Sequence, residues 1–165
     1  ALAGLKSVTE GGVITAGNAS QITDGAAAVM VCNDAGLKKI KTDPRARIVA
    51  ISVVGDDPIM MLGGPIPASH KVLKAAGLNI NDIDLYEVNE AFAPVPLSWA
   101  IELKADKDKL NVNGGAMALG HPLGATGAKL MTTLLHELER RDAKFGLQAI
   151  CEGGGTANAT IIERI

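Results

Sequence analysis

The sequence is poor in aromatic residues, in cysteine and in long apolar runs. Aromatic side chains make up only 2% of the 165 residues, whereas glycine occurs 19 times. Because small side chains let elements pack closely and let backbone approach a ligand, this composition predicts a layered α/β core with glycine loops at its site. The two cysteines, Cys32 and Cys151, are far apart and form no CxxC pair, so neither a disulfide framework nor a zinc site is indicated. We expect two free thiols and no metal.

Charge and hydropathy exclude further classes. No apolar run approaches the ~18–20 residues that span a bilayer, and the first residues do not resemble a signal peptide. Sixteen basic against 18 acidic residues leave no electrostatic footprint for nucleic acid or for an anionic membrane. A hydrophobic fraction of 47% is typical of a folded chain. We therefore expect one folded, soluble, cytoplasmic domain without a nucleic-acid or membrane partner.

Hydrophobic patterning predicts alternating strands and helices. Strands are expected over residues 26–32, 46–55, 83–88, 145–151 and 156–165, and helices over residues 34–40, 67–76, 89–103 and 128–141. Pro94 and Pro96 predict a kink or a late start in one of these helices, because proline lacks an N–H and crowds the preceding turn. The order β-α-β-α-β-α-loop-α-β-β indicates a layered sheet with helices on its faces and a final antiparallel hairpin.

Two segments lack such patterning. Residues 1–16 favour neither helix nor strand and are interpreted as the tail of a preceding region. Residues 111–127 form a long glycine-rich loop, and loops of that length in compact domains are usually functional.

Three reactive side chains lie among glycines or at expected element ends. His121 lies in this loop, Cys151 ends a strand before three glycines, and Asn89 follows another strand. Backbone N–H groups that converge at such a glycine turn can stabilise a negative oxygen. Taken singly, His121 also fits a loop histidine bonded to its neighbours, Cys151 a small core residue and Asn89 a helix cap. Cys32 is assigned to a strand core.

Taken together, four motifs carry a resemblance. "GNASQITDGAAAV" (17–29), "VNEAFA" (88–93), "NVNGGAMALGHPLGATGA" (111–128) and "CEGGG" (151–155) resemble, in this order, the C-terminal half of the thiolases. The resemblance covers nearly the whole chain and places the thiolase C-terminal domain at residues 17–165. It implies an α/β fold, a β-α-β-α-β-α-β-β half with a mixed sheet that stacks against a similar half.

The resemblance implies an acyltransferase of fatty acid and lipid metabolism that makes or cleaves 3-ketoacyl-CoA by a Claisen step. His121 would deprotonate a nucleophilic cysteine and help bind the thioester oxygen, with Asn89 orienting a water beside it. Cys151 would move the α-proton of acetyl-CoA, and the N–H of Gly153 would be one donor of the second oxyanion hole. A thiolate acts as this base if nearby dipoles lower its pKa, so we expect a lowered pKa for Cys151.

The resemblance also implies substrates and partners. Ser20 and Phe92 resemble positions that line the pantetheine channel, so CoA and acyl-CoA would bind as substrates, with no permanently bound cofactor. The family's nucleophilic cysteine belongs to an N-terminal half whose motif is absent here, so this chain would carry half an active site and be inactive alone. The complete enzyme would be a homodimer or homotetramer, and the isolated chain would expose an apolar helix face.

Two alternatives stay open. A related condensing enzyme such as a ketoacyl synthase shares the fold, but the cysteine of "CEGGG" argues against it. A non-catalytic binding or assembly module could retain the motifs and would bind CoA without turnover.

Overall fold

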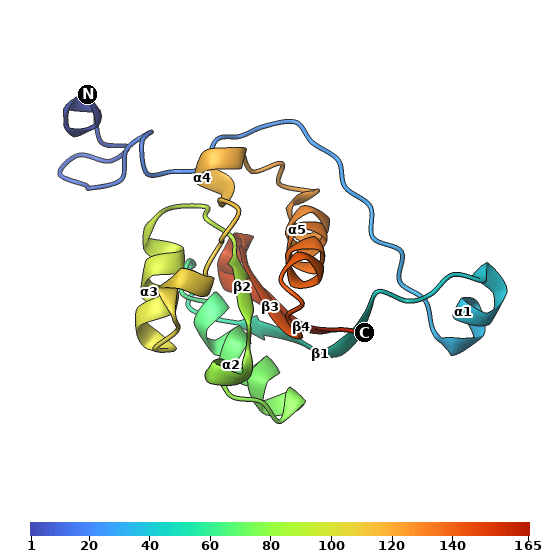
Figure 1. The fold of residues 1–165 in the computed structure, drawn as a ribbon. Helices are drawn as coiled ribbons and strands as arrows, with labels where there is room; N and C mark the ends of the chain where they lie inside the picture. The colour runs from blue at the N-terminus through green and yellow to red at the C-terminus, as the bar shows by residue number, and fades with distance from the viewer.

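A four-stranded mixed sheet lies at the centre of the computed structural model, which describes residues 1–165 (Figure 1). Its strands are β1 (Ala46–Gly55), β2 (Leu85–Val88), β3 (Phe145–Glu152) and β4 (Thr156–Arg164), in the spatial order β1-β4-β3-β2. β2 and β3 are parallel, whereas β4 pairs antiparallel with both β3 and β1. The predicted α/β class and the antiparallel final hairpin are confirmed.

Helices cover both faces of the sheet (Figure 1). α2 (Pro65–Ala76) and α3 (Pro94–Glu102) pack on one face, where 15 buried residues form the larger core around Trp99. α5 (Thr126–Arg140) packs on the other face over a smaller core of Leu85, Leu134, Leu138 and Ile162. A Cβ on Gly146 would lie 2.8 Å from the Leu134 side chain, so glycine in β3 lets α5 approach the sheet this closely.

Several predicted elements are confirmed. Strand β1 has the expected bounds, and β3 extends the expected strand by one residue. The short helix α1 (Asp34–Ile40) begins after Asn33, whose side chain accepts a hydrogen bond from the Gly36 N–H. Helix α3 starts late, at Pro94, as its two prolines predict. Asn89 therefore lies outside the helix, and its interpretation as a helix cap is wrong.

The strand expected over residues 26–32 is wrong. This segment contains no strand, and Met30 and Val31 are 76% and 68% exposed. Cys32, expected in a strand core, is exposed as well. A strand needs a hydrogen-bonded neighbour, and no other segment of this chain pairs with these residues.

Other corrections concern element ends. α2 begins two residues before its expected start, and β2 begins at Leu85 rather than Ile83. The glycine-rich loop contains the short helix α4 (Ala116–Leu119). Four 3-10 turns, η1 to η4, cover Leu2–Gly4, Ile80–Asp82, Lys107–Lys109 and Gly153–Gly155. No helix has the length and apolar character needed to cross a membrane.

The N-terminal segment contacts two loops beside the sheet through backbone hydrogen bonds. The Ser20 N–H donates to Ala91 O at 3.0 Å, and the His121 N–H donates to Gln21 O at 2.9 Å. Beyond these contacts the chain runs past α5 to α1, which lies on the opposite side of the molecule (Figure 1). Residues 18–22 therefore touch the loops on either side of the candidate site.

Candidate active site

The candidate site lies where β2 and β3 end. Because these strands are parallel, their carboxyl ends meet at one edge of the sheet, where open α/β sheets bind ligands. Asn89 follows β2, and its N–H donates to Ala149 O of β3 at 3.0 Å. Cys151 is near the end of β3, and Gly153 opens the turn that follows. The topology thus brings the predicted residues Asn89, Cys151 and Gly153 to one edge.

His121 reaches this edge from the glycine-rich loop. Its Nε2 lies 3.4 Å from Nδ2 of Asn89, and its Nδ1 lies 2.6 Å from Oγ1 of Thr126. The Thr126 hydroxyl donates its single hydrogen to Pro122 O, so its oxygen accepts the Nδ1 hydrogen of His121. This tautomer leaves a lone pair on Nε2, which is the form needed for a general base.

The surroundings keep the imidazole neutral. Burial, and then the positive charge of Lys129, lower the pKa of His121 below its usual 6.5. The Lys129 ammonium donates to Gly120 O at 2.8 Å, which fixes the backbone next to His121. His121 is therefore uncharged at neutral pH and able to accept a proton.

The pKa of Cys151 corrects the prediction. Burial raises the pKa of this half-buried thiol above 9.0, and the charge of Glu152 also raises it. A backbone hydrogen bond lowers the pKa, but by less than burial raises it. No hydrogen bond joins the thiol to His121 or Asn89. The expected lowered pKa is wrong for this chain, because desolvation outweighs the local dipoles. Cys151 is a thiol at neutral pH.

The turn after Cys151 requires glycine. Gly154 and Gly155 have φ angles of 77° and 79°, and a Cβ on Gly155 would lie 2.8 Å from Asp56 O. Gly153 has open space around its Cα and lies at the surface. The sharp turn therefore leaves the Gly153 backbone accessible beside the end of β3.

Ser20 and Phe92 lie together through their backbones. Ala19 forms a bridge with Phe92, and the Ala93 N–H donates to Asn18 O at 2.9 Å. A Cβ on Gly120 would lie 2.5 Å from Oγ1 of Thr23, so the same segment also packs closely on the loop that carries His121. The structure thus brings both predicted binding residues to the loops of the site.

A set of polar contacts, here called the clasp, joins the loop after β2 to the glycine-rich loop. The sequence alone did not reveal it. The Asn111 side chain accepts from the Val88 N–H and donates to Val88 O and to Glu90 Oε1, each at 2.9 Å. The other carboxylate oxygen of Glu90 accepts from the Met117 N–H at 3.1 Å. A Cβ on Gly115 would lie only 1.9 Å from the Glu90 carboxyl carbon. The only hint of the clasp in the sequence is Asn111 and Gly115 at the two ends of "NVNGG".

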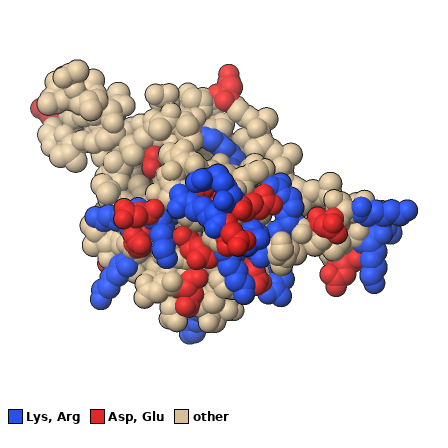
Figure 2. Space-filling model, in the orientation of Figure 1, with Lys and Arg blue, Asp and Glu red and all other residues tan.

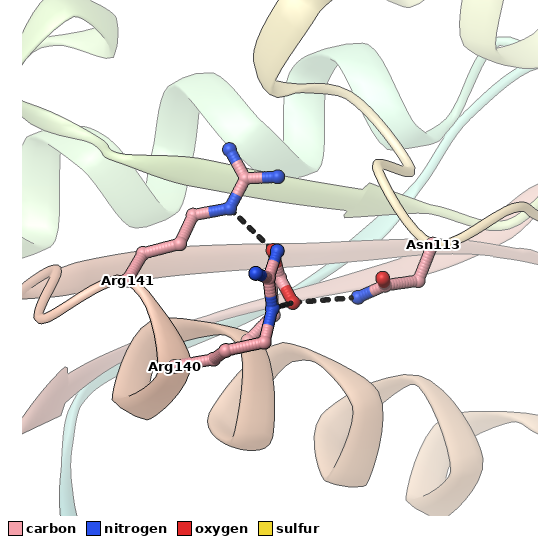
Figure 3. A network of polar contacts seen from close by, with 4 residues as sticks. Asn113, Arg140 and Arg141 are labelled. Carbon is pink, nitrogen blue, oxygen red and sulfur yellow. Dashed lines mark hydrogen bonds and ion pairs between the residues drawn. The ribbon is translucent and has the colours of Figure 1, made fainter.

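A second anchor joins the same loop to α5 (Figure 3). The buried Glu137 carboxylate, the unlabelled residue in Figure 3, accepts from Asn113 Nδ2 at 3.0 Å and from Arg140 Nε at 2.8 Å, and also pairs with Arg141. These contacts, above all the one with Arg140, lower the pKa of Glu137 to about 2. The start of the glycine-rich loop is thereby fixed to the helix that follows it.

Charged side chains are spread unevenly over the face shown in Figure 2. Basic and acidic groups are interspersed over its lower part, and its upper part carries few charges. A shallow hollow lies beside His121, between the 23–27 segment and residues 122–125 with Ala128. No group of three or more His, Cys, Asp or Glu side chains is placed to hold a metal ion.

Comparisons with known proteins agree with this arrangement. The family profile described as "Thiolase, C-terminal domain" matches residues 42–164, and that described as "Thiolase, N-terminal domain" matches residues 1–35. The steroid 3-ketoacyl-CoA thiolase FadA6 of Mycobacterium tuberculosis is 58% identical over 164 residues, which cover 99% of this chain and 40% of that protein.

Solved structures give the same result. The Bacillus anthracis acetyl-CoA acetyltransferase superposes with a TM-score of 0.95 and 44% identity, over 99% of this chain and 42% of that chain. Human mitochondrial 3-ketoacyl-CoA thiolase in complex with CoA superposes with a TM-score of 0.91 and 46% identity, again over 99% and 42%. The chain thus spans about two fifths of the length of the relatives it matches. Because the C-terminal profile covers most of the sequence, the chain belongs to the thiolase family.

Proposed function

We propose that this chain supplies the histidine and the acid/base cysteine of a thiolase active site. The observation that carries the proposal is the contact between Asn89 and the lone-pair nitrogen of His121 at the sheet edge where Cys151 and Gly153 also lie. The acyl group would be held by a nucleophilic cysteine outside this chain. Relatives named 3-ketoacyl-CoA thiolase and acetyl-CoA acetyltransferase support this reaction class.

In the first half-reaction His121 accepts the proton of the nucleophile. The attacking sulfur forms a bond to the carbonyl carbon, whose C=O electron pair moves onto the oxygen, and His121 with a water held by Asn89 stabilises this negative oxygen. In the condensation direction the intermediate then breaks its C–S bond to CoA, which leaves as a thiol with the proton held by His121. In the cleavage direction the C–C bond to the α-carbon breaks instead, and acetyl-CoA leaves as its enolate. The neutral imidazole and its Nε2 lone pair support this role. Fixed donors and a fixed base reduce the reorganisation that the charged intermediate requires.

In the second step Cys151 moves the α-proton. In the cleavage direction its thiol gives a proton to the α-carbon of the departing acetyl-CoA, and in the condensation direction its thiolate removes that proton. The raised pKa of Cys151 favours the thiol, which is the form that cleavage needs. The accessible Gly153 N–H would bind the enolate oxygen, whose charge makes the α-proton removable.

The substrates proposed are CoA and acyl-CoA, without a permanent cofactor. A relative's structure contains CoA. Ser20 and Phe92 would line the path of the pantetheine arm, since both belong to segments that frame the site.

The partner proposed is a thiolase N-terminal half that carries the nucleophile. Val29, Met30 and Val31 are an extended apolar stretch with large exposed fractions, and they fall within the N-terminal profile match. The complete protein would be a cytoplasmic homodimer or homotetramer. The boundary between residues 1–16 and 17–165 stays a prediction, and the two family profiles divide the chain between residues 35 and 42.

Complementation tests the proposal. Thiolysis of acetoacetyl-CoA is measured with the purified chain, with and without a separately expressed N-terminal thiolase half. We expect no turnover alone and turnover after addition. The variant His121→Ala removes the base and should stay inactive, whereas His136→Ala, at an exposed position on α5, should complement. Turnover by the chain alone would mean that Cys151 or Cys32 carries the acyl group, which overturns the proposal.

A further inference from the structure

A row of polar side chains lies buried beneath α5. Glu87 of β2, Gln148 of β3 and Thr160 of β4 are register partners across three neighbouring strands, and they are 2%, 4% and 8% exposed. Glu87 lies on the same strand face as Leu85, which packs in the core under α5, because side chains two residues apart share a face. Nothing in the proposed reaction uses Glu87.

Three buried oxygens near this row have no hydrogen-bond donor. They are Oε2 of Glu87, Oε1 of Gln148 and Oδ1 of Asn89. An ionised carboxylate only accepts hydrogen bonds, so an ionised Glu87 offers no donor to Oε1 of Gln148 on the adjacent strand. Buried acceptors without donors are unfavourable and uncommon in native proteins.

One proton on Glu87 removes two of these three unsatisfied groups. A protonated carboxyl is a donor, and its register partner Gln148 has a buried oxygen, Oε1, that lacks a donor. The charges around it also favour the neutral form. Burial is the largest cause and raises the pKa of Glu87 to about 8, with Glu90 and Glu137 adding to the rise and Lys129 opposing it. The remaining neighbours along the row, Gln148 and Thr160, are uncharged.

We propose that Glu87 is a positioning residue held as a neutral carboxylic acid. It donates a hydrogen bond to Gln148 Oε1, and it places no negative charge beneath the Asn89–His121 pair. Asn89 is two residues from Glu87, and its N–H continues the pairing of β2 with β3 by donating to Ala149 O. A carboxylate there would oppose the negative oxygen of the proposed reaction and, in the condensation direction, the Cys151 thiolate, since charges interact strongly where water is excluded. This role rests on the proposed function, whereas the protonation of Glu87 does not.

Infrared spectroscopy of the 165-residue chain tests the protonation directly. We expect the carbonyl stretch of a protonated carboxyl at pH 6.5, far above the usual glutamate pKa of 4.5, and its loss as the pH rises through about 8. The band should be absent in Glu87→Gln and present in the control Glu102→Gln, which changes an exposed carboxyl at the end of α3. The variant Gln148→Met removes the acceptor and should shift the band to higher frequency. A wild-type spectrum without the band at pH 6.5 overturns the proposal, even if every variant fails to fold.

The positioning role is read from a pH profile of the complemented enzyme. Ionisation of Glu87 should cause a decline of kcat above pH 8, and Glu87→Gln should lose this decline because its side chain stays neutral. An unchanged alkaline decline in Glu87→Gln overturns the positioning role. Failure of complementation by the wild-type chain would instead count against the proposed function and leave the infrared result standing.

Discussion

Nδ2 of Asn89 lies 3.4 Å from Nε2 of His121 and joins the loop after β2 to the loop before α5. The two residues come from different elements, so their contact depends on the parallel pairing that ends β2 at this edge and on the anchors that hold the glycine-rich loop. The Nε2 lone pair faces Asn89. It is available because Thr126, on the other side of the ring, accepts the hydrogen that Nδ1 carries. The tautomer of His121 is therefore set by Thr126 and not by Asn89.

Thr126→Val should change the tautomer of His121. The variant keeps the shape of the side chain but removes the oxygen that accepts from Nδ1, so both tautomers become populated. Nitrogen NMR of the labelled ring should show a single Nδ1–H form in the wild-type chain and a mixture in the variant. The complemented enzyme should lose about tenfold in kcat, the size expected for one lost hydrogen bond. Thr126→Ser retains the hydroxyl and should behave as wild type; a ring spectrum unchanged in Thr126→Val would refute this assignment.

Gly115→Ala should destabilise the chain by about 1–3 kcal/mol, because the added Cβ would overlap the Glu90 carboxyl group. Thermal unfolding followed by circular dichroism measures the loss. Gly124→Ala is the matched control in the same loop, since nothing lies within 4 Å of the added Cβ there. Equal unfolding temperatures for the two variants would show that the clasp between Glu90 and Asn111 does not fix the loop.

Glu137→Gln should lower the free energy of unfolding at neutral pH by about 1 kcal/mol, a modest value because both arginine partners are solvent-exposed. The folded pKa of Glu137, about 2, lies below its usual 4.5, so its contribution is fully present above pH 4.5 and is lost as the pH falls toward 2. Urea unfolding at a series of pH values should therefore show the two proteins converging in acid. Glu139→Gln breaks an exposed ion pair with Arg45 and serves as the control with a smaller effect. A difference independent of pH would rule out this electrostatic account.

The sequence predicted elements whose patterning is local. The β-branched run of β1, the apolar stripe of α5 and the prolines that delay α3 each act through neighbours along the chain. The strand expected over residues 26–32 failed because a strand needs a neighbour that can lie far along the sequence, and no segment of this chain pairs with these residues.

The site was predicted in part by motif. The structure brings Asn89 and His121 together and places Cys151 at the adjacent strand end, while the roles assigned to these residues stay predictions. The clasp of Asn111 with Glu90 joins residues 21 positions apart, and a single sequence does not show such a pairing. The raised pKa of Cys151 could not be predicted either, because it depends on how deeply the folded chain buries the thiol.

The two half-reactions of the Cys151→Ala variant, measured in one complemented sample, test the central claim most directly. Mass spectrometry follows acylation of the nucleophile by acetyl-CoA, and deuterium uptake from heavy water follows removal of the α-proton. We predict that acylation persists while deuterium uptake and condensation fall by about 10²-fold or more, as expected when a general base is removed. Equal loss of both half-reactions would contradict the assignment of Cys151 as the group that moves the α-proton.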